Sequence, residues 1–289
     1  MNLRLLFSSA ALALVLVSPG TAATPFLPTG AVSKNVDTSL AIRGGAGPLD
    51  VELTAKAATG IFGLQGLYNY LAPEKNHDAY GFEQSVDGLA IWMSTGVGAQ
   101  FLTFAIAAYF SLFHNMPALK ACGAGLIVCC VENLRSVLND TASKNGVAGG
   151  GQVLNLVIHS FVAYALLSEV SFAETVGKAF GAWLIVACLQ ARLAPATCLK
   201  TWGFDGDASD SVILYTKTTG QAGVAFGAFI GSIANGAEVT SAIGYYSVAV
   251  LLSLAEMVAS GYLEDLGLSK DKVYPWLAIL LAFVGTLAV

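Results

Sequence analysis

Long apolar runs alternate with short polar stretches from Val51 to the end of the chain. Each run has about the 17 to 25 residues that an α-helix needs to cross a bilayer. Glycine and proline within the runs do not argue against helices, because neighbouring helices can satisfy the freed backbone groups in lipid. The pattern predicts eight transmembrane helices joined by short polar loops, near residues 53–72, 88–112, 118–138, 152–170, 174–194, 211–234, 240–262 and 273–289.

The composition of the chain favours the same fold class. Hydrophobic residues make up 55% of the sequence and charged residues only 11%, with a mean hydropathy of +0.67. A soluble domain has far more charge. We therefore expect an all-α polytopic integral membrane protein, with membrane lipids as its surroundings. With 14 basic against 19 acidic residues, the chain offers no basic stripe for a nucleic-acid backbone, and nucleic acid is excluded as a partner.

The N-terminal segment has the pattern of a signal peptide over residues 1–23. Arg4 precedes an apolar core from Leu5 to Val17, and small residues follow at Thr21 to Ala23. The core is too short to cross a bilayer, which takes about 20 residues. Residues 24–50 are rich in Pro, Gly, Ser and Thr and lack an apolar period, so they predict a flexible tail or a second targeting segment.

The junction "ATPFLP", with Ala23, Phe26 and Pro28, resembles the Ala-Ser-Ala-Phe-Ala-Pro junction of two-part presequences that direct proteins into secondary plastids of algae. This resemblance implies a plastid membrane, entered through the secretory pathway. An ordinary membrane of the secretory pathway is the alternative.

Two stretches share a skeleton, "LAPEKNHDAYGF" at 71–82 and "LAPATCLKTWGF" at 193–204. An offset of 122 residues, changing to 124 later in the chain, superposes further residues of the two halves. We therefore expect a tandem duplication of a four-helix unit, with repeats at 51–172 and 173–289. Because each unit has an even number of spans, the repeats should be parallel. The matched residues are Glu52 with Glu174, Lys56 with Lys178, Pro73 with Pro195, Thr95-Gly96 with Thr219-Gly220, and Glu132 with Glu256.

About half of each repeat resembles the DoxX-like membrane proteins. The shared features are a first helix that ends in Pro73 or Pro195, a loop that closes on Gly-Phe, and a second helix that contains glycine. The resemblance implies a four-helix membrane fold and no particular activity.

Basic residues indicate the orientation, because short loops rich in Lys and Arg stay on the side from which the chain is inserted. A cleaved signal peptide places the mature N-terminus in the lumen. Both termini are then lumenal, and most of the basic residues lie on the insertion side, namely Lys75, Arg135, Lys144, Arg192, Lys200, Lys217, Lys270 and Lys272.

Ionisable groups within the spans are the strongest functional candidates, since a charge at membrane depth costs several kcal/mol unless it is paired or wet. Glu132 has Arg135 one turn later on the same helix face. Glu256 has no basic residue nearby in the sequence, so it needs a partner from another helix or a proton. His159 could exchange protons near neutral pH.

Other polar residues at similar depth could belong to the same site, or they could hold helices together at about 0.6–2 kcal/mol each. They are Gln65, Asn69, Asn155, Gln190, Arg192, Lys217 and Gln221. Two further pairs with i,i+4 spacing, Glu52 with Lys56 and Glu174 with Lys178, begin the first and fifth spans, and we expect them to anchor these helices at the membrane surface.

Several chemistries lack the residues they need. The five cysteines show no CxxC pair and no zinc spacing, and His159 is the only histidine clearly within a span, which argues against a haem held by two histidines. His77 and Asp78 should lie in a solvated loop. The sequence therefore predicts neither a metal nor a cofactor.

Three functional classes follow from these patterns. The first is a carrier for a small solute or for protons, with Glu132, Glu256 and His159 lining a site on the axis between the repeats. The second is a non-catalytic bundle that binds lipid or pigment or assembles with a membrane protein complex. An enzyme acting on a lipid is less favoured, since only His159 and Glu132 could form its acid–base pair. A cavity between the repeats would favour transport, and a dry glycine seam would favour assembly.

Overall fold

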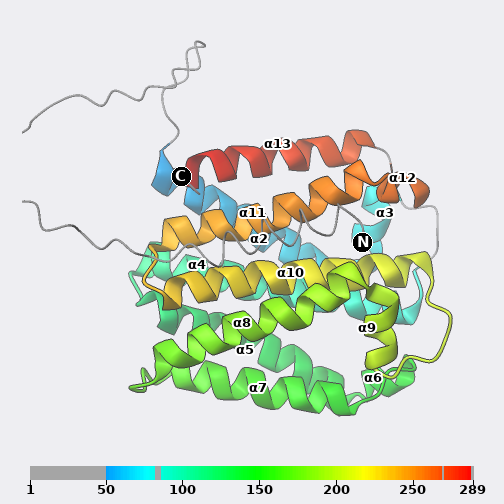
Figure 1. Cartoon of the computed structure of the whole chain (residues 1–289), viewed down its shortest axis with the longest axis horizontal. Helices are drawn as coiled ribbons and strands as arrows, with labels where there is room; N and C mark the ends of the chain where they lie inside the picture. The colour runs from blue at the N-terminus through cyan, green and yellow to red at the C-terminus, as the bar shows by residue number, and fades with distance from the viewer. Residues whose placement is uncertain (1–49, 82–85, 269, 288–289) are drawn as a thin grey trace, which may run out of the picture.

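The computed structural model describes residues 50–81, 86–268 and 270–287, which are helical and contain no strand. Eight helices of at least 18 residues run side by side in one bundle (Figure 1). Their ends agree with the predicted apolar runs to within three residues, so the positions of the helices are confirmed. They are α2 (Val51–Leu71), α4 (Gly88–His114), α5 (Ala118–Leu138), α7 (Gly150–Leu167), α8 (Ala173–Leu193), α10 (Asp210–Ala234), α11 (Val239–Ala259) and α13 (Lys270–Leu287).

Five of these helices, α4, α5, α7, α8 and α11, are long and apolar enough to cross a membrane. This finding, with an all-helical fold, indicates an integral membrane protein. The predicted signal peptide (1–23) and nearly all of the predicted tail (24–50) lie outside the described residues.

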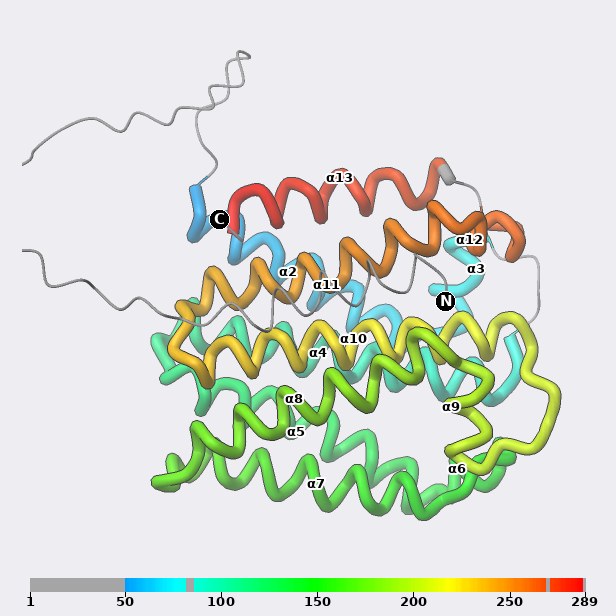
Figure 2. The backbone as a smooth tube through the Cα atoms, viewed as in Figure 1, coloured from blue at the N-terminus to red at the C-terminus, as the bar shows by residue number. Residues whose placement is uncertain are grey.

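Four short helices gather at one end of the bundle, on the right in Figure 2. They are α3 (Pro73–Tyr80), α6 (Thr141–Lys144), α9 (Pro195–Thr201) and α12 (Tyr262–Asp265). Both Leu-Ala-Pro stretches therefore form helices, where the sequence predicted loops. Pro73 and Pro195 stand at the first helical position, where the missing N–H leaves no hydrogen bond unmade. Lys75, Lys144 and Lys200 belong to these short helices, so three of the basic residues expected on one side of the membrane lie at one end.

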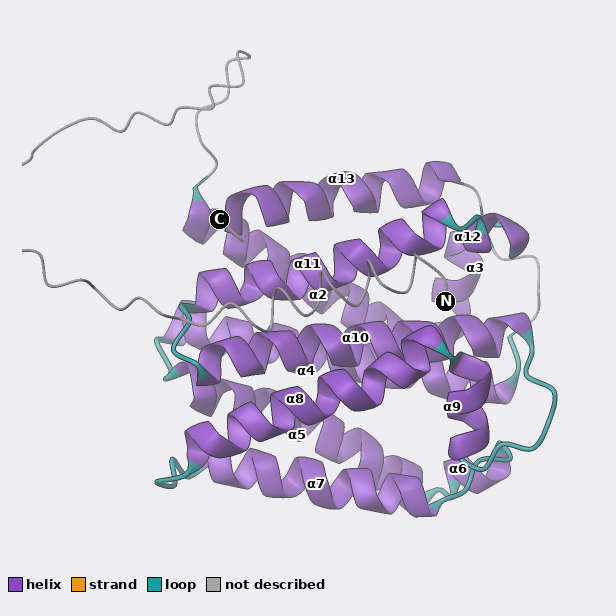
Figure 3. Ribbon diagram, viewed as in Figure 1, coloured by secondary structure: helices purple, strands orange, loops and turns teal. Residues whose placement is uncertain are grey.

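The order of packing in the first half is repeated in the second. In the first half α2 packs on α4, α4 on α5 and α5 on α7, and in the second α8 packs on α10, α10 on α11 and α11 on α13. The halves meet through α4 and α10 at the centre, and through α7 with α8 and α13 with α2 at the sides. Helices α2 and α8 run in the same direction, because each begins on the left and leads on the right into the short helix that follows it, α3 or α9 (Figure 1 and Figure 3).

The starts of α4 and α10 lie side by side and share their caps. Asp87 accepts a hydrogen bond from the backbone N–H of Ala90, and Ser209 accepts one from that of Val212. The Ser209 hydroxyl also donates to the Asp87 carboxylate at 2.7 Å. The cap of each central helix is thus bonded to the cap of the other, which fixes where the two halves meet.

Aromatic rings fill the space between α4 and its neighbouring helices. The ring of Phe104 stacks on Tyr246 with centroids 3.7 Å apart, and meets Phe229 edge-on at 5.0 Å. Phe62 packs edge-on against Tyr246 at 5.0 Å. These side chains are buried, and they join four helices, α2 and α4 of the first half and α10 and α11 of the second, into one core.

Two glycines allow similar close contacts between helices in the two halves. A Cβ atom on Gly98 would lie 2.5 Å from the backbone nitrogen of Tyr70, and one on Gly220 would lie 2.5 Å from that of Arg192. Gly98 and Tyr70 of the first contact each lie 122 positions before Gly220 and Arg192 of the second. This spacing aligns Gly98 with Gly220 at an offset of 122, whereas the sequence comparison aligned Thr95-Gly96 with Thr219-Gly220 at 124.

The third helices of the two halves give a second offset. Helices α5 (118–138) and α11 (239–259) begin and end 121 positions apart. Glu132 then corresponds to Ser253, and Glu256 corresponds to Arg135. The helix ends thus give an offset of 121, which does not align the two glutamates, whereas the offset of 124 from the sequence comparison does.

Candidate functional site

Three of the predicted site residues, Glu132, Asn155 and His159, line one cavity of about 400 Å³, which we call cavity A. It lies between α4, α5 and α7 of the first half and α8 and α10 of the second. Helices from both halves therefore build its walls.

Glu132 meets the partner expected from its spacing. The guanidinium of Arg135 donates two hydrogen bonds of 2.9 Å to the two oxygens of the Glu132 carboxylate. The Glu132 side chain is 8% exposed and that of Arg135 is 51% exposed. The arginine also lies 5.7 Å from the ring of Tyr70 in α2. The buried charge in the cavity wall is thus neutralised by a cation that extends to the outer surface.

His159 is held in one tautomer by its own helix. Its Nδ1 lies 2.7 Å from the backbone oxygen of Asn155, and a carbonyl oxygen can only accept, so Nδ1 carries the proton. In the neutral ring Nε2 is then an acceptor. The ring packs edge-on against Phe180 at 5.5 Å and Trp183 at 6.4 Å, which places it at the contact between α7 and α8.

Three further polar groups of cavity A were missed by sequence reasoning. Gln100 Oε1, Ser136 Oγ and Thr219 Oγ1 line the cavity, are shielded from solvent, and have no hydrogen-bond partner within the described part of the chain. Buried polar atoms are rarely left unpaired. Gln100 carries the same signal as Gln65 and Gln221, a glutamine within an apolar run. Ser136 and Thr219 do not, because serine and threonine are common in membrane helices and no spacing singles these two out.

Cavity A reaches the side of the bundle between α7 and α8. Two of its lining residues, Leu154 on α7 and Trp183 on α8, are 59% and 37% exposed. The outer face of α7 around this point is apolar and includes exposed Val157 and Phe161. Part of the cavity lining is therefore exposed on a face that suits lipid, while Val147, Ala148 and Trp202 line it at the end of the bundle that holds the short helices.

Gln65 and Asn69 lie in a second cavity of about 150 Å³, which we call cavity B. It is enclosed by α2, α4, α10, α11 and α13. Asn76 of α3 joins the two predicted residues: it accepts from Gln65 at 3.1 Å and donates to Asn69 at 2.6 Å. These amides therefore fasten α3 to α2 and are not part of the same site as Glu132.

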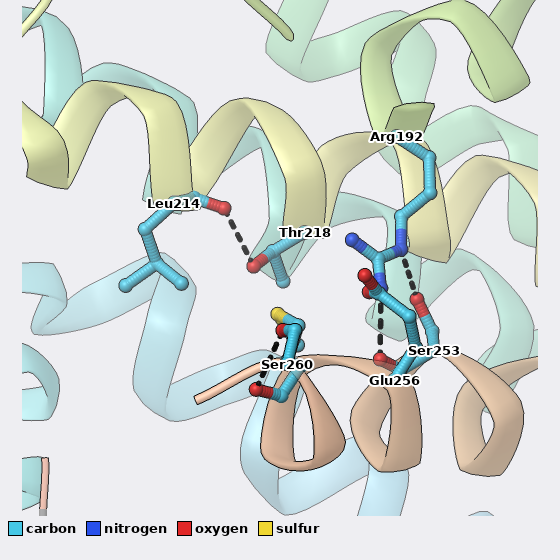
Figure 4. Close-up of polar contacts among 7 residues, drawn as sticks. Arg192, Leu214, Thr218, Ser253, Glu256 and Ser260 are labelled. Atoms are coloured by element: carbon cyan, nitrogen blue, oxygen red, sulfur yellow. Dashed lines mark hydrogen bonds and ion pairs between the residues drawn. The ribbon is translucent and has the colours of Figure 1, made fainter. Parts of the chain in front are cut away.

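Glu256 finds its partner on another helix, as the sequence required. Figure 4 shows Arg192 of α8 reaching the side chains of Ser253 and Glu256 on α11. The guanidinium also donates to the backbone oxygen of Ser253 at 2.8 Å. The Arg192 side chain is 9% exposed and that of Glu256 is 41% exposed. This cluster lines neither cavity, so the predicted site containing both glutamates is not formed.

The other predicted residues serve as contacts between helices. Gln190 donates to Thr201 of α9 at 3.3 Å, and Lys217 lies 4.1 Å from the ring of Tyr262. Of the two pairs at helix starts, Glu52 and Lys56 form a surface ion pair. Glu174 and Lys178 are both exposed and form none of the ion pairs found among the described residues.

The expectation of a solvated loop around His77 is wrong. His77 is 1% exposed, and its Nδ1 lies 3.2 Å from the hydroxyl of Tyr215. The polar neighbours "EKNHD" suggested a loop, but a helix over 73–80 turns the side chain of His77 toward α10.

No protein-family model, curated protein or solved structure matches this chain. The fold and the two cavities are therefore the observations on which a function must rest. Within the described ranges, no three His, Cys, Asp or Glu side chains are close enough together to hold a metal ion.

Proposed function

We propose that this protein is an eight-helix membrane protein, built by tandem duplication of a four-helix unit, that binds a small membrane-soluble molecule in cavity A. The repeated packing order supports the duplication, as do the matching contacts of Gly98 and Gly220. The bonded caps Asp87 and Ser209, also 122 positions apart, support it as well. Parallel direction of α2 and α8 fits repeats with an even number of spans.

The observation that carries the proposed binding is the set of unpartnered oxygens in cavity A, on Gln100, Ser136 and Thr219. A cavity of about 400 Å³ falls in the range of small-molecule sites, which are mostly apolar with a few converging polar groups. A ligand that hydrogen-bonds to these oxygens would remove the cost of leaving them unpaired, about 1–3 kcal/mol each.

The walls of cavity A favour an uncharged amphiphile with a hydroxyl head. A hydroxyl donates to the Gln100 oxygen and can accept from Ser136 or Thr219. A carboxylate or phosphate head would meet the Glu132 carboxylate in the wall, and Arg135 is already engaged with it. The apolar part of the ligand would leave the cavity between α7 and α8, where Leu154 is exposed.

Tryptophan fluorescence offers a direct test, because Trp92, Trp183 and Trp202 line cavity A while Trp276 lines cavity B. A dibrominated long-chain alcohol, whose bromines quench nearby indoles, is titrated into purified protein in detergent. We expect saturable quenching that falls in Trp183→Phe, falls further when Trp92 and Trp202 are also replaced by Phe, and is retained in the matched control Trp276→Phe. A dibrominated fatty acid should quench more weakly.

Variants of the polar wall test whether the hydroxyl is recognised. Ser136→Ala and Thr219→Val remove two of the unpartnered oxygens and should each weaken saturable binding of the alcohol several-fold. Quenching that rises linearly with the alcohol, equally in wild type and variants, would mean partition into the micelle and would refute the proposal.

A carrier is the second candidate, favoured by the fact that both halves build the walls of cavity A around His159. The test is to measure the uptake of protons and of a panel of metabolites into liposomes that contain the protein. Because Glu132 lines the cavity and Glu256 does not, Glu132→Gln should abolish flux while Glu256→Gln should leave it nearly unchanged. Equal effects of both substitutions, or no flux in wild type, would count against a carrier.

A further inference from the structure

Cavity B, like cavity A, is lined by helices of both halves, and it is the positional counterpart of cavity A. Lining residues of the first two helices of each half correspond at an offset of 122, and those of the last two at 121. The corresponding pairs, with the residue of the first half given first, are Phe62 and Leu184, Gln65 and Ala187, Met93 and Tyr215, Gly96 and Thr218, Ala99 and Gln221, Cys129 and Val250, Asn155 and Trp276, and His159 and Leu280.

The chemistry of the two cavities differs at these positions. Trp276 and Leu280 stand in cavity B where Asn155 and His159 stand in cavity A. Large apolar side chains thus occupy the space of the polar ones, which agrees with the smaller volume of about 150 Å³. Apolar cavities of this size hold compact ligands such as benzene.

Most polar groups that line cavity B already have partners. Gln65, Asn69 and Asn76 bond to one another. Tyr215 bonds to His77, and the hydroxyl of Thr218 donates to the backbone of its own helix.

Gln221 is the exception in this wall. It is 6% exposed, and its Oε1 has no hydrogen-bond partner within the residues that the structure describes. An amide deep in an apolar cavity is costly unless something bonds to it. This side chain is therefore the polar contact that a ligand would use.

We propose that cavity B is a second binding site, for a compact and mostly apolar molecule that carries one hydroxyl group, bound through the side-chain amide of Gln221. A hydroxyl can donate to the amide oxygen or accept from the amide nitrogen, so it suits either orientation of the amide. The site is distinct from cavity A in its walls, its volume and its ligand.

Phenol and toluene test the proposal, because they have nearly the same shape and differ in one hydroxyl. Each is titrated into the detergent-solubilised full chain while the emission of Trp276 and the thermal midpoint are followed. The variant Gln221→Met keeps the length of the side chain and removes the amide. Gln190→Met makes the same change at a glutamine that lines neither cavity and is the matched control.

We expect phenol to bind wild type and Gln190→Met more tightly than toluene does, with a change in emission that is lost in Trp276→Phe. In Gln221→Met, phenol binding should weaken about five- to tenfold, while toluene binding holds or improves. If Gln221→Met fails to fold, Gln221→Leu serves in its place.

Equal phenol affinities in wild type and Gln221→Met would overturn the proposal. So would saturable binding that leaves the emission of Trp276 unchanged. The test is independent of cavity A, because Trp183 reports on that cavity and Trp276 on this one. Cavity A could prove empty while cavity B binds phenol, or the reverse.

Discussion

The close contact at Gly98 gives the sharpest prediction for stability. A methyl group placed there would lie 2.5 Å from the Tyr70 nitrogen and 2.8 Å from the Gly66 oxygen. Carbon atoms pack best at about 3.5–4.0 Å, so α2 and α4 would have to separate by roughly 1 Å. Both obstacles are backbone atoms of a helix, which cannot swing away as a side chain can.

The expected net effect of Gly98→Ala is a loss of about 1–2 kcal/mol. Overpacking of a core costs about 1–3 kcal/mol. If the two helices separate by about 0.5–1 Å, each contact between them also loses about a quarter to a half of its dispersion energy. Alanine in a helix interior returns roughly 0.5–1 kcal/mol relative to glycine. Gly220→Ala should behave alike, because its methyl group would lie 2.5 Å from the Arg192 nitrogen.

Matched controls lie on the same helices. A Cβ atom on Gly96 of α4 or Gly231 of α10 would have no other atom within 4 Å, so alanine there should be neutral or stabilising. Unfolding of each variant by SDS in mixed micelles, followed by circular dichroism, gives the free energies. If Gly98→Ala proves as stable as Gly96→Ala, the packing of α2 on α4 described above is wrong.

Three further predictions follow from polar contacts. Glu256→Gln should destabilise the fold by about 1–2 kcal/mol in the same assay, because Arg192 is buried, whereas Glu52→Gln in an exposed pair should cost less than about 0.5 kcal/mol. Burial raises the pKa of Tyr80 to about 12 from 10.0. The unfolded chain then loses this proton at a lower pH than the folded chain does. The free energy of unfolding should therefore fall as the pH rises from about 10 to about 12, by up to about 1.4 kcal/mol per pH unit. In Tyr80→Phe this decrease should be smaller. Burial also raises the pKa of the Cys198 thiol to about 11, so maleimide at pH 8 should label it slowly until the protein is unfolded; rapid labelling of the folded protein would contradict this.

The helices could be predicted from the sequence because their ends coincide with changes from apolar to polar residues. Local charge pairs could also be predicted, since Glu132 and Arg135 share one helix face. The need of Glu256 for a distant partner was visible too. Its identity was not, because Arg192 lies 64 positions away on another helix and only the packing of α8 near α11 brings them together.

The cavity walls were harder to predict because the same residue types have two uses in a membrane helix. Thr216 and Thr95 satisfy their hydroxyls on their own backbone, four residues earlier. Thr219, on the same helix as Thr216, faces cavity A without a partner. Polarity alone cannot separate these cases, since the difference lies in which neighbour the helix face meets.

The two halves keep the contacts that position helices and differ in the residues that line cavities. Gly98 and Gly220 make the same backbone approach, and Asp87 and Ser209 cap equivalent helices. A duplicated chain with two identical cavities would bind the same ligand in both. In the duplication that we propose, Trp276 and Leu280 take the positions of Asn155 and His159, which makes the two cavities different. Differences in ligand binding between the two cavities should therefore come from the residues of their walls. Substitutions at the matching helix contacts, such as Gly98 and Gly220, should destabilise the two halves to a similar degree.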